Sequence, residues 1–122
     1  MSNYKLLYVT CGSKKEAQNI GKALVKNSLV ACANIVPNIN SIFKWKNKIS
    51  SSKEFILLGK TQTKNIKNIF KTIKDKHSYD CPCILFFNIE QGNNDFLKWI
   101  KKNSNSINIL WLQCVNKMII LR

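Results

Sequence analysis

The stretch from Leu29 to Lys46 constrains the fold of this chain more than any other part of the sequence. It is rich in β-branched and aromatic residues and too long for an ordinary loop, so it predicts one long, bent strand. Pro37 has no amide hydrogen to donate, so it must lie at an edge or a bulge. Beyond it the side chains alternate between two faces, which separates Trp45 from Lys44. The sequence therefore predicts a bulge at Pro37 and Asn38, after which the strand projects beyond the subunit body.

Local signals place the other elements along the chain. Ser13 and Glu16 have the spacing of a capping box, in which the Ser13 hydroxyl accepts from the amide of Glu16 and the Glu16 carboxylate accepts from the amide of Ser13. Asn47 tolerates a left-handed backbone and predicts the tip of a hairpin, and Ser50–Ser52 predict a break before the next strand. The patterns predict helices after Ser13, along the apolar stripe from Ile66 to Ile73 and over Asp95–Lys102, and strands over Tyr4–Cys11, Phe55–Thr61, Ile84–Ile89 and Ile107–Leu112.

The order of these elements is β-α-β-β-α-β followed by a helix and a strand, which predicts an α+β fold of the ferredoxin-like, split βαβ kind. Two right-handed crossovers put both main helices on the same face of the sheet. The strands are nonetheless apolar on both faces, as in Phe55 to Leu58, and strands of that kind are normally covered on both sides. The sequence therefore predicts one domain over residues 1–122, with a partner subunit covering the second face.

The charge of the chain and the segments it lacks argue against nucleic-acid and membrane partners. The chain has a formal charge of +14, but nearly all of the positive charge is lysine and the only arginine is Arg122. The bidentate contacts with which arginine reads nucleic acid are therefore missing, and we expect a lysine-rich solvated surface without a nucleic-acid partner. No apolar run approaches the roughly 20 residues of a membrane span, and no secretory signal is present, which predicts a cytoplasmic protein without a membrane partner.

Motifs of the common enzyme classes are absent from the sequence. There is a single histidine, His77, and there is no glycine-rich phosphate loop, nucleophile elbow or paired-carboxylate motif. A Cys-His nucleophile would need a cysteine to fold against His77. The five cysteines form an odd set without a secretory signal, which disfavours a disulfide framework and predicts free thiols. We expect a protein that is not an enzyme.

Cys81 and Cys83 are the first metal-binding candidates. In an extended segment both thiols point to one side, about 6.6 Å apart at the backbone, and they can lean onto one soft metal. With His77 they offer two sulfurs and one nitrogen, a set suited to Cu(I) or Zn(II) with one position open. The alternative is that one thiol packs in the core, the other is exposed, and His77 only ends a helix. Cys11 and Cys32 each have the same two interpretations, a buried structural thiol or a thiol of the site.

Short motifs in a fixed order resemble those of a known family. They are Val9-Thr10-Cys11, Leu29 to Pro37, Ser41 to Trp45, Lys60-Thr61, His77 to Pro82, and Gly92-Asn93 with Phe96 to Ile100. Together they resemble the CutA divalent-cation tolerance proteins from about Tyr8 to Ile100. The resemblance implies a ferredoxin-like subunit in a tight homotrimer, whose long hairpins pack against neighbouring subunits, without catalytic activity and able to bind copper or another divalent metal ion. The segment from Ser106 to Arg122 lies largely outside the match.

The chain departs from the family pattern at two kinds of position. Where the family usually has His-Pro-Tyr-Glu and Pro-Glu-Ile, this chain has His77-Ser78-Tyr79-Asp80 and Pro82-Cys83-Ile84. A thiol thus replaces a carboxylate that is a metal-ligand candidate in the family. Asn38 and Asn47 stand where the family usually has a permissive glycine.

Lys60, Tyr79 and Trp45 form the last candidate site. They line a pocket for an anion between subunits, or Trp45 and Tyr79 anchor the subunit interface while Lys60 pairs with a carboxylate.

The sequence as a whole leads to two hypotheses about function. The first is a non-enzymatic homotrimer that binds metal ions and contributes to metal tolerance. The alternative is a trimeric regulatory or scaffold protein, similar in fold to the PII proteins, that binds a small anionic ligand or a partner protein in its subunit clefts.

Overall fold

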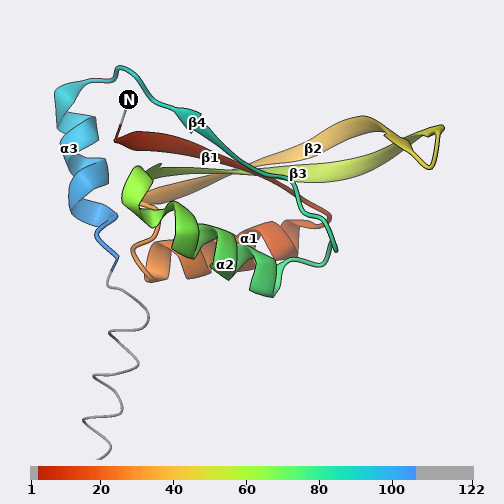
Figure 1. Cartoon of the computed structure of the whole chain (residues 1–122), viewed down its shortest axis with the longest axis horizontal. Coiled ribbons are helices and arrows are strands. Elements are labelled where there is room, and N and C mark those ends of the chain that lie inside the picture. Colours follow the sequence, from red (N-terminus) through yellow and green to blue (C-terminus); the bar gives the residue numbers. More distant parts are fainter. Residues whose placement is uncertain (1–2, 107–122) are drawn as a thin grey trace, which may run out of the picture.

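The computed structural model describes residues 3–106, and its elements follow the predicted order (Figure 1). They are β1 (Tyr4–Cys11), α1 (Lys14–Lys26), β2 (Cys32–Trp45), β3 (Lys48–Gln62), a 3₁₀ turn (Thr63–Asn65), α2 (Ile66–Lys76), β4 (Ile84–Asn88) and α3 (Asn94–Asn103). The predicted ferredoxin-like α+β fold is confirmed. The predicted fifth strand, Ile107–Leu112, lies outside the described residues, and the assignment of residues 1–122 to one domain stays a prediction.

The four strands form one antiparallel sheet in the order β2-β3-β1-β4. β1 pairs along its whole length with β3 on one side, and with β4 from Lys5↔Asn88 to Val9↔Ile84 on the other. Both α1 and α2 cover the same face of the sheet, as two right-handed crossovers predict (Figure 1). Because β1 and β4 are antiparallel neighbours, the end of β1 lies beside the loop that leads into β4.

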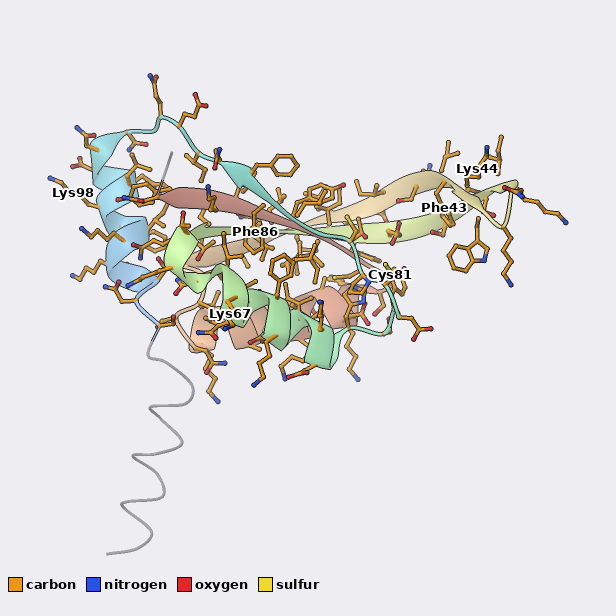
Figure 2. All side chains as sticks on the ribbon, viewed as in Figure 1. Phe43, Lys44, Lys67, Cys81, Phe86 and Lys98 are labelled. Carbon is orange, nitrogen blue, oxygen red and sulfur yellow. The ribbon has the colours of Figure 1, made fainter. Side chains whose placement is uncertain are left out.

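The hydrophobic core fills the layer between the sheet and the two helices. Alternate residues of β1 point into it, following the two-residue period of a strand. Phe86 packs against this core from β4 (Figure 2). Its ring meets that of Phe70 edge-on, at 5.3 Å between centroids. Each buried leucine or isoleucine contributes about 1.5–3 kcal/mol of burial free energy. The fully buried members are Leu7, Val9, Cys11, Ala17, Ile20, Leu24, Val30, Leu57, Ile69 and Ile73.

The β2–β3 hairpin extends beyond the sheet as a two-stranded arm (Figure 1). Its pairing register shifts after Val36, and Asn38 has a left-handed φ of 58°, so the predicted bulge at Pro37 and Asn38 is confirmed. At the tip Lys46 and Asn47 have φ angles of 49° and 63°, the pattern of a type I′ turn. Both asparagines therefore occupy left-handed positions, which explains why they can stand in for glycine.

Two strand boundaries differ from the prediction. β3 begins at Lys48, because Ser50–Ser52 continue the ladder with β2 instead of breaking it. β2 begins at Cys32 and not at Leu29, because the amide of Leu29 donates to the carbonyl of Leu24 and closes the end of α1. In both places backbone hydrogen bonds decide the boundary, and side-chain type does not.

The face of the sheet opposite α1 and α2 is apolar and partly exposed. Leu85 and Phe87 of β4 are about half exposed there, and Phe87 lies edge-on to Tyr8 of β1, at 6.2 Å between ring centroids. Trp45, near the tip of the arm, is 63% exposed. Apolar surface of this kind is typical of an interaction site. We call the face of the sheet that carries Tyr8, Leu85 and Phe87 the open face. In the described chain it is left uncovered, so it is available to the partner subunit that the sequence predicts.

α3 packs at the end of the sheet where β1 begins (Figure 1). Its Ile100 is buried, and polar contacts hold the residues after it. Gln62 Nε2 and Asn65 Nδ2 both donate to the carbonyl of Ser104, at 3.1 Å and 2.7 Å. None of the helices described in residues 3–106, α3 included, has the length and apolarity needed to cross a membrane.

Candidate functional site

The loop from His77 to Cys83 joins α2 to β4 and passes beside the end of β1. Figure 2 shows Cys81 on this loop, at the end of the sheet from which the arm projects. Because Val9 pairs with Ile84, the residues after Val9 lie opposite the residues before Ile84. The loop thereby meets the end of β1 and the turn that follows it. The end of β1 carries Cys11, and the loop carries the other predicted metal ligands, His77, Cys81 and Cys83.

The turn between β1 and α1 contains the predicted capping box, with one difference. The Ser13 hydroxyl accepts from the amide of Glu16 at 3.1 Å, as predicted. The returning bond ends one residue earlier, because Glu16 Oε1 accepts from the amide of Gly12 at 3.3 Å and not from that of Ser13. The carboxylate is thereby directed toward the end of β1 and the 77–83 loop.

The Glu16 carboxylate joins the two segments. Its Oε2 accepts from the amide of Ser78 at 3.0 Å, and its Oε1 lies 3.6 Å from His77 Nε2. Burial raises the pKa of this carboxyl, but hydrogen bonds from Ser78 and Gly12 and the neighbouring His77 hold the pKa below its usual value. The proline that the family usually has at position 78 would have no amide hydrogen to donate. The hydrogen bond from the amide of Ser78 to Glu16 therefore requires a residue other than proline at this position.

The side chain of His77 is fully buried, and both ring nitrogens have partners. Nδ1 accepts from the amide of Tyr79 at 3.1 Å, and Nε2 lies 2.8 Å from the carbonyl oxygen of Thr10. An amide N–H only donates and a carbonyl only accepts, so Nδ1 is the acceptor and Nε2 the donor in these two contacts. The imidazole therefore ties the end of β1 to the start of the loop.

Cys11 completes a cluster of three metal-ligating side chains with Glu16 and His77. One ligand atom from each residue lies within 4.8 Å of the others. Burial, followed by the negative charges of Glu16 and Glu54, raises the pKa of the Cys11 thiol to about 12. The thiol therefore stays protonated at neutral pH unless a cation displaces the proton. Among residues 3–106, no other group of three His, Cys, Asp or Glu side chains has this spacing.

The donor atoms of this cluster suit a divalent metal ion. Thiolate sulfur, imidazole nitrogen and carboxylate oxygen all bind Zn(II), and three protein ligands leave a fourth position open. Two features of the structure disfavour binding of an ion. The Cys11 thiol must lose its proton, and His77 must break its hydrogen bond with the Tyr79 amide or with the Thr10 carbonyl. Binding of an ion here is therefore coupled to proton release and to movement of the 77–83 loop.

Tyr79 connects the cluster to a neighbouring cavity. Its hydroxyl donates to Glu54 Oε2 at 3.0 Å, and its ring centroid lies 4.8 Å from that of His77. Partial burial, this hydrogen bond and the charge of Glu54 raise the pKa of Tyr79 to about 12. Gly12 leaves space for the phenol, since a Cβ built on Gly12 would lie 3.0 Å from the hydroxyl oxygen.

Cys81 and Cys83 lie together in that cavity and not in the cluster. Cys81 is exposed and Cys83 is half-buried, so neither is a core residue. The structure thus divides the four predicted metal ligands into two groups, Cys11 with His77 and Cys81 with Cys83, and their role in binding a metal stays a prediction. The cavity has a volume of about 360 Å³ and is lined by Thr10, Phe43, Ser52, Glu54, Tyr79, Cys81 and Cys83.

The remaining predicted site residues are spread along the sheet. Cys32 and Lys60 are direct neighbours across β2 and β3, and the Lys60 ammonium donates to the side-chain oxygen of Asn34 and not to a carboxylate. Trp45 lies about 40 Å along the hairpin from Lys60, at roughly 3.3 Å per residue. Within one chain Trp45 therefore cannot line a pocket with Lys60 and Tyr79, and the predicted anion pocket would need the arm of a second subunit.

Sequence reasoning misses two carboxylates of the site. Glu16 has a signal, the capping box, but that motif predicts a helix cap and no contact with His77. Glu54 has no local signal, because its 8% exposure depends on the loop that carries Tyr79. A second cavity, of about 380 Å³ between α1 and β2, offers no thiol, imidazole or carboxylate to a metal. It is lined by Gln18, Gly21, Lys22, Val25, Lys26, Ala33, Ile35 and Leu57.

Comparisons with known proteins find relatives over most of the chain. A sequence model of the family described as CutA1 divalent ion tolerance protein matches residues 5–103. The divalent-cation tolerance protein CutA of Archaeoglobus fulgidus is 39% identical over 97 residues, which are 80% of this chain and 94% of that protein. The protein CutA of Homo sapiens is 33% identical over 100 residues, which are 82% of this chain. The chain spans 56% of the length of this human relative.

Solved structures have the same fold. The structure of the divalent cation tolerance protein CutA1 from Thermus thermophilus matches with a TM-score of 0.82 at 34% identity, and the match covers 84% of this chain and 99% of that one. The structure of CutA from Archaeoglobus fulgidus matches with a TM-score of 0.81 at 37% identity, over 84% of this chain and 99% of that one. The structural matches and the sequence match over residues 5–103 therefore indicate the same family.

Proposed function

The chain belongs to the CutA1 family of divalent-ion tolerance proteins, and we propose that it acts as a non-enzymatic, homotrimeric metal-binding protein that contributes to tolerance of copper or another divalent ion. The observation that carries the proposal is the cluster of Cys11, Glu16 and His77, whose ligand atoms lie within 4.8 Å of one another. The Cys11 thiolate, the Glu16 carboxylate and one His77 ring nitrogen bind the ion. The ion is bound and stored, and it takes no part in a reaction.

Proton release gives the sharpest test of this site. Because the pKa of Cys11 is raised to about 12, the thiol must give up its proton when the ion binds. Calorimetric titration of the reduced chain with Zn(II), in buffers of different protonation enthalpy, should show about one proton released per ion bound. Between pH 7 and 8 the Zn(II) affinity should rise about tenfold per pH unit.

Substitutions in the cluster test which residues hold the ion. Cys11→Ser and His77→Gln should each weaken Zn(II) binding by at least tenfold. Asp75→Asn, which changes a carboxylate on α2 outside the cluster, should leave the affinity unchanged. Circular dichroism of each variant without metal checks that it is folded. A folded Cys11→Ser variant with the original affinity and proton release would show that the cluster is not the site.

Assembly and location have separate support. The open face and the exposed arm leave apolar surface that a homotrimer would bury. The described thiols, Cys11, Cys32, Cys81 and Cys83, are all free, and free thiols persist in a reducing compartment such as the cytoplasm.

A further inference from the structure

We infer that Cys81 and Cys83 form a second metal site, a dithiol that takes a thiophilic monovalent cation of the Cu(I) type. It lies in the cavity beside the Cys11–Glu16–His77 cluster and uses none of the ligands of that cluster. The inference extends the proposed function to a second class of ion, and it can be tested separately because its ligands are different.

The spacing of the two cysteines along the chain allows both thiols to bind one ion. Residues two apart in an extended chain have α-carbons at most about 7 Å apart. Metal–sulfur bonds of about 2.3 Å bring two sulfurs that share one ion to within roughly 4.6 Å, which the side chains can reach. Pro82 has a fixed φ and restricts the residue before it, so little conformational freedom remains between Cys81 and Cys83. Both side chains line the same cavity of about 360 Å³.

The cavity wall favours a cation although the chain as a whole is strongly basic. The formal charge of the chain is +14, yet the residues that line this cavity include no lysine or arginine. They include the carboxylate of Glu54, which is only 8% exposed. Tyr79 donates to Glu54 Oε2 and so holds the carboxylate in the wall. A fixed negative charge of this kind in a partly closed site stabilises a bound cation.

The ligand type selects the class of ion. Thiolates are soft ligands that favour Cu(I), whereas Zn(II) usually completes a four-coordinate shell. As the ion binds, each thiol transfers its proton to the buffer and each sulfur forms one bond to the metal, without any change of oxidation state. Cys81 is exposed, so an ion can pass to it from a carrier by ligand exchange before Cys83 completes the site.

The test is anaerobic titration of the full, reduced chain with Cu(I) held by a coloured chelator of known affinity. The chain should take one Cu(I) from the chelator into the dithiol. Cys81→Ser and Cys83→Ser should each lower the Cu(I) affinity at least 100-fold. Cys83→Glu, which restores the carboxylate usual in the family, should lose Cu(I) to the same extent. Cys32→Ser removes a half-buried thiol outside the cavity and should leave the affinity unchanged.

Two further measurements separate this site from the cluster. Cys11→Ser should keep the tight Cu(I) while losing Zn(II) affinity, and Cys83→Ser should keep Zn(II) while losing Cu(I). Circular dichroism confirms that each variant is folded. Tight binding of Cu(I) that survives in folded Cys81→Ser and Cys83→Ser variants would overturn the inference, as would a wild-type chain that takes no Cu(I) from the chelator.

Discussion

Glu16 is the residue on which the geometry of the site depends most. In the folded protein its pKa is lowered from 4.5, so the unfolded chain binds this proton more tightly. Its stabilising contribution is therefore present above pH 4.5 and is lost as the pH falls through the lowered pKa. We expect Glu16→Gln to reduce the free energy of unfolding by about 1–2 kcal/mol at pH 7, because the amide cannot accept from both Gly12 and Ser78. Urea unfolding at pH 7 measures this loss.

The pH dependence supplies the control for this substitution. The chain has only six Asp and Glu residues, so the loss of one carboxylate should be visible in the acid limb of its stability. The stability of Glu16→Gln should fall less steeply than that of the wild type below pH 4.5. Glu90→Gln, at an exposed position, should follow the wild-type curve. Parallel curves for wild type and Glu16→Gln would mean that the carboxylate does not carry the contacts described above.

At the scale of elements, local chemistry made most of the fold predictable. Pro37 and Asn38 predict the bulge, and Asn47 predicts the hairpin tip, because few residues tolerate these backbone angles. Ser50–Ser52 misled the prediction, since their strand is held by backbone bonds to β2. The site was harder to predict because the contact of His77 with Cys11 requires the pairing of β4 with β1. Sequence proximity groups His77 with Cys81, whereas the sheet brings it to the end of β1.

The left-handed residue of the bulge gives a test at this scale. Asn38 has a φ of 58°, where a β-branched side chain is strained. We expect Asn38→Val to reduce the free energy of unfolding by about 1–2 kcal/mol. Asn38→Gly, which adopts this angle freely, should change it by less than about 0.5 kcal/mol. Chemical unfolding of the three proteins measures both effects, and equal losses for valine and glycine would contradict the role of the backbone angle.

At the scale of the whole molecule, one chain leaves two apolar regions without a covering layer. The helices cover one face of the sheet (Figure 1). The open face carries Leu85 and Phe87, which are about half exposed. The arm holds Trp45 far from the core of its own subunit, where its 63% exposure gives it little part in the stability of that subunit. Both features are accounted for together if the arm of each subunit lies against its neighbours in a trimer.

Trp45→Ala tests this assembly directly. If Trp45 fills a closed pocket between subunits, its removal should weaken association by about 3 kcal/mol, or roughly 100-fold in the dissociation constant. Light scattering during serial dilution should then show Trp45→Ala dissociating at concentrations where the wild type remains a trimer.

Lys44→Ala is the control for this prediction, because Lys44 lies on the other face of the same strand, and it should dissociate like the wild type. Unfolding of the separated subunits should be nearly unchanged, because Trp45 is outside the subunit core. Equal dissociation of Trp45→Ala and the wild type would place the arm outside the interface.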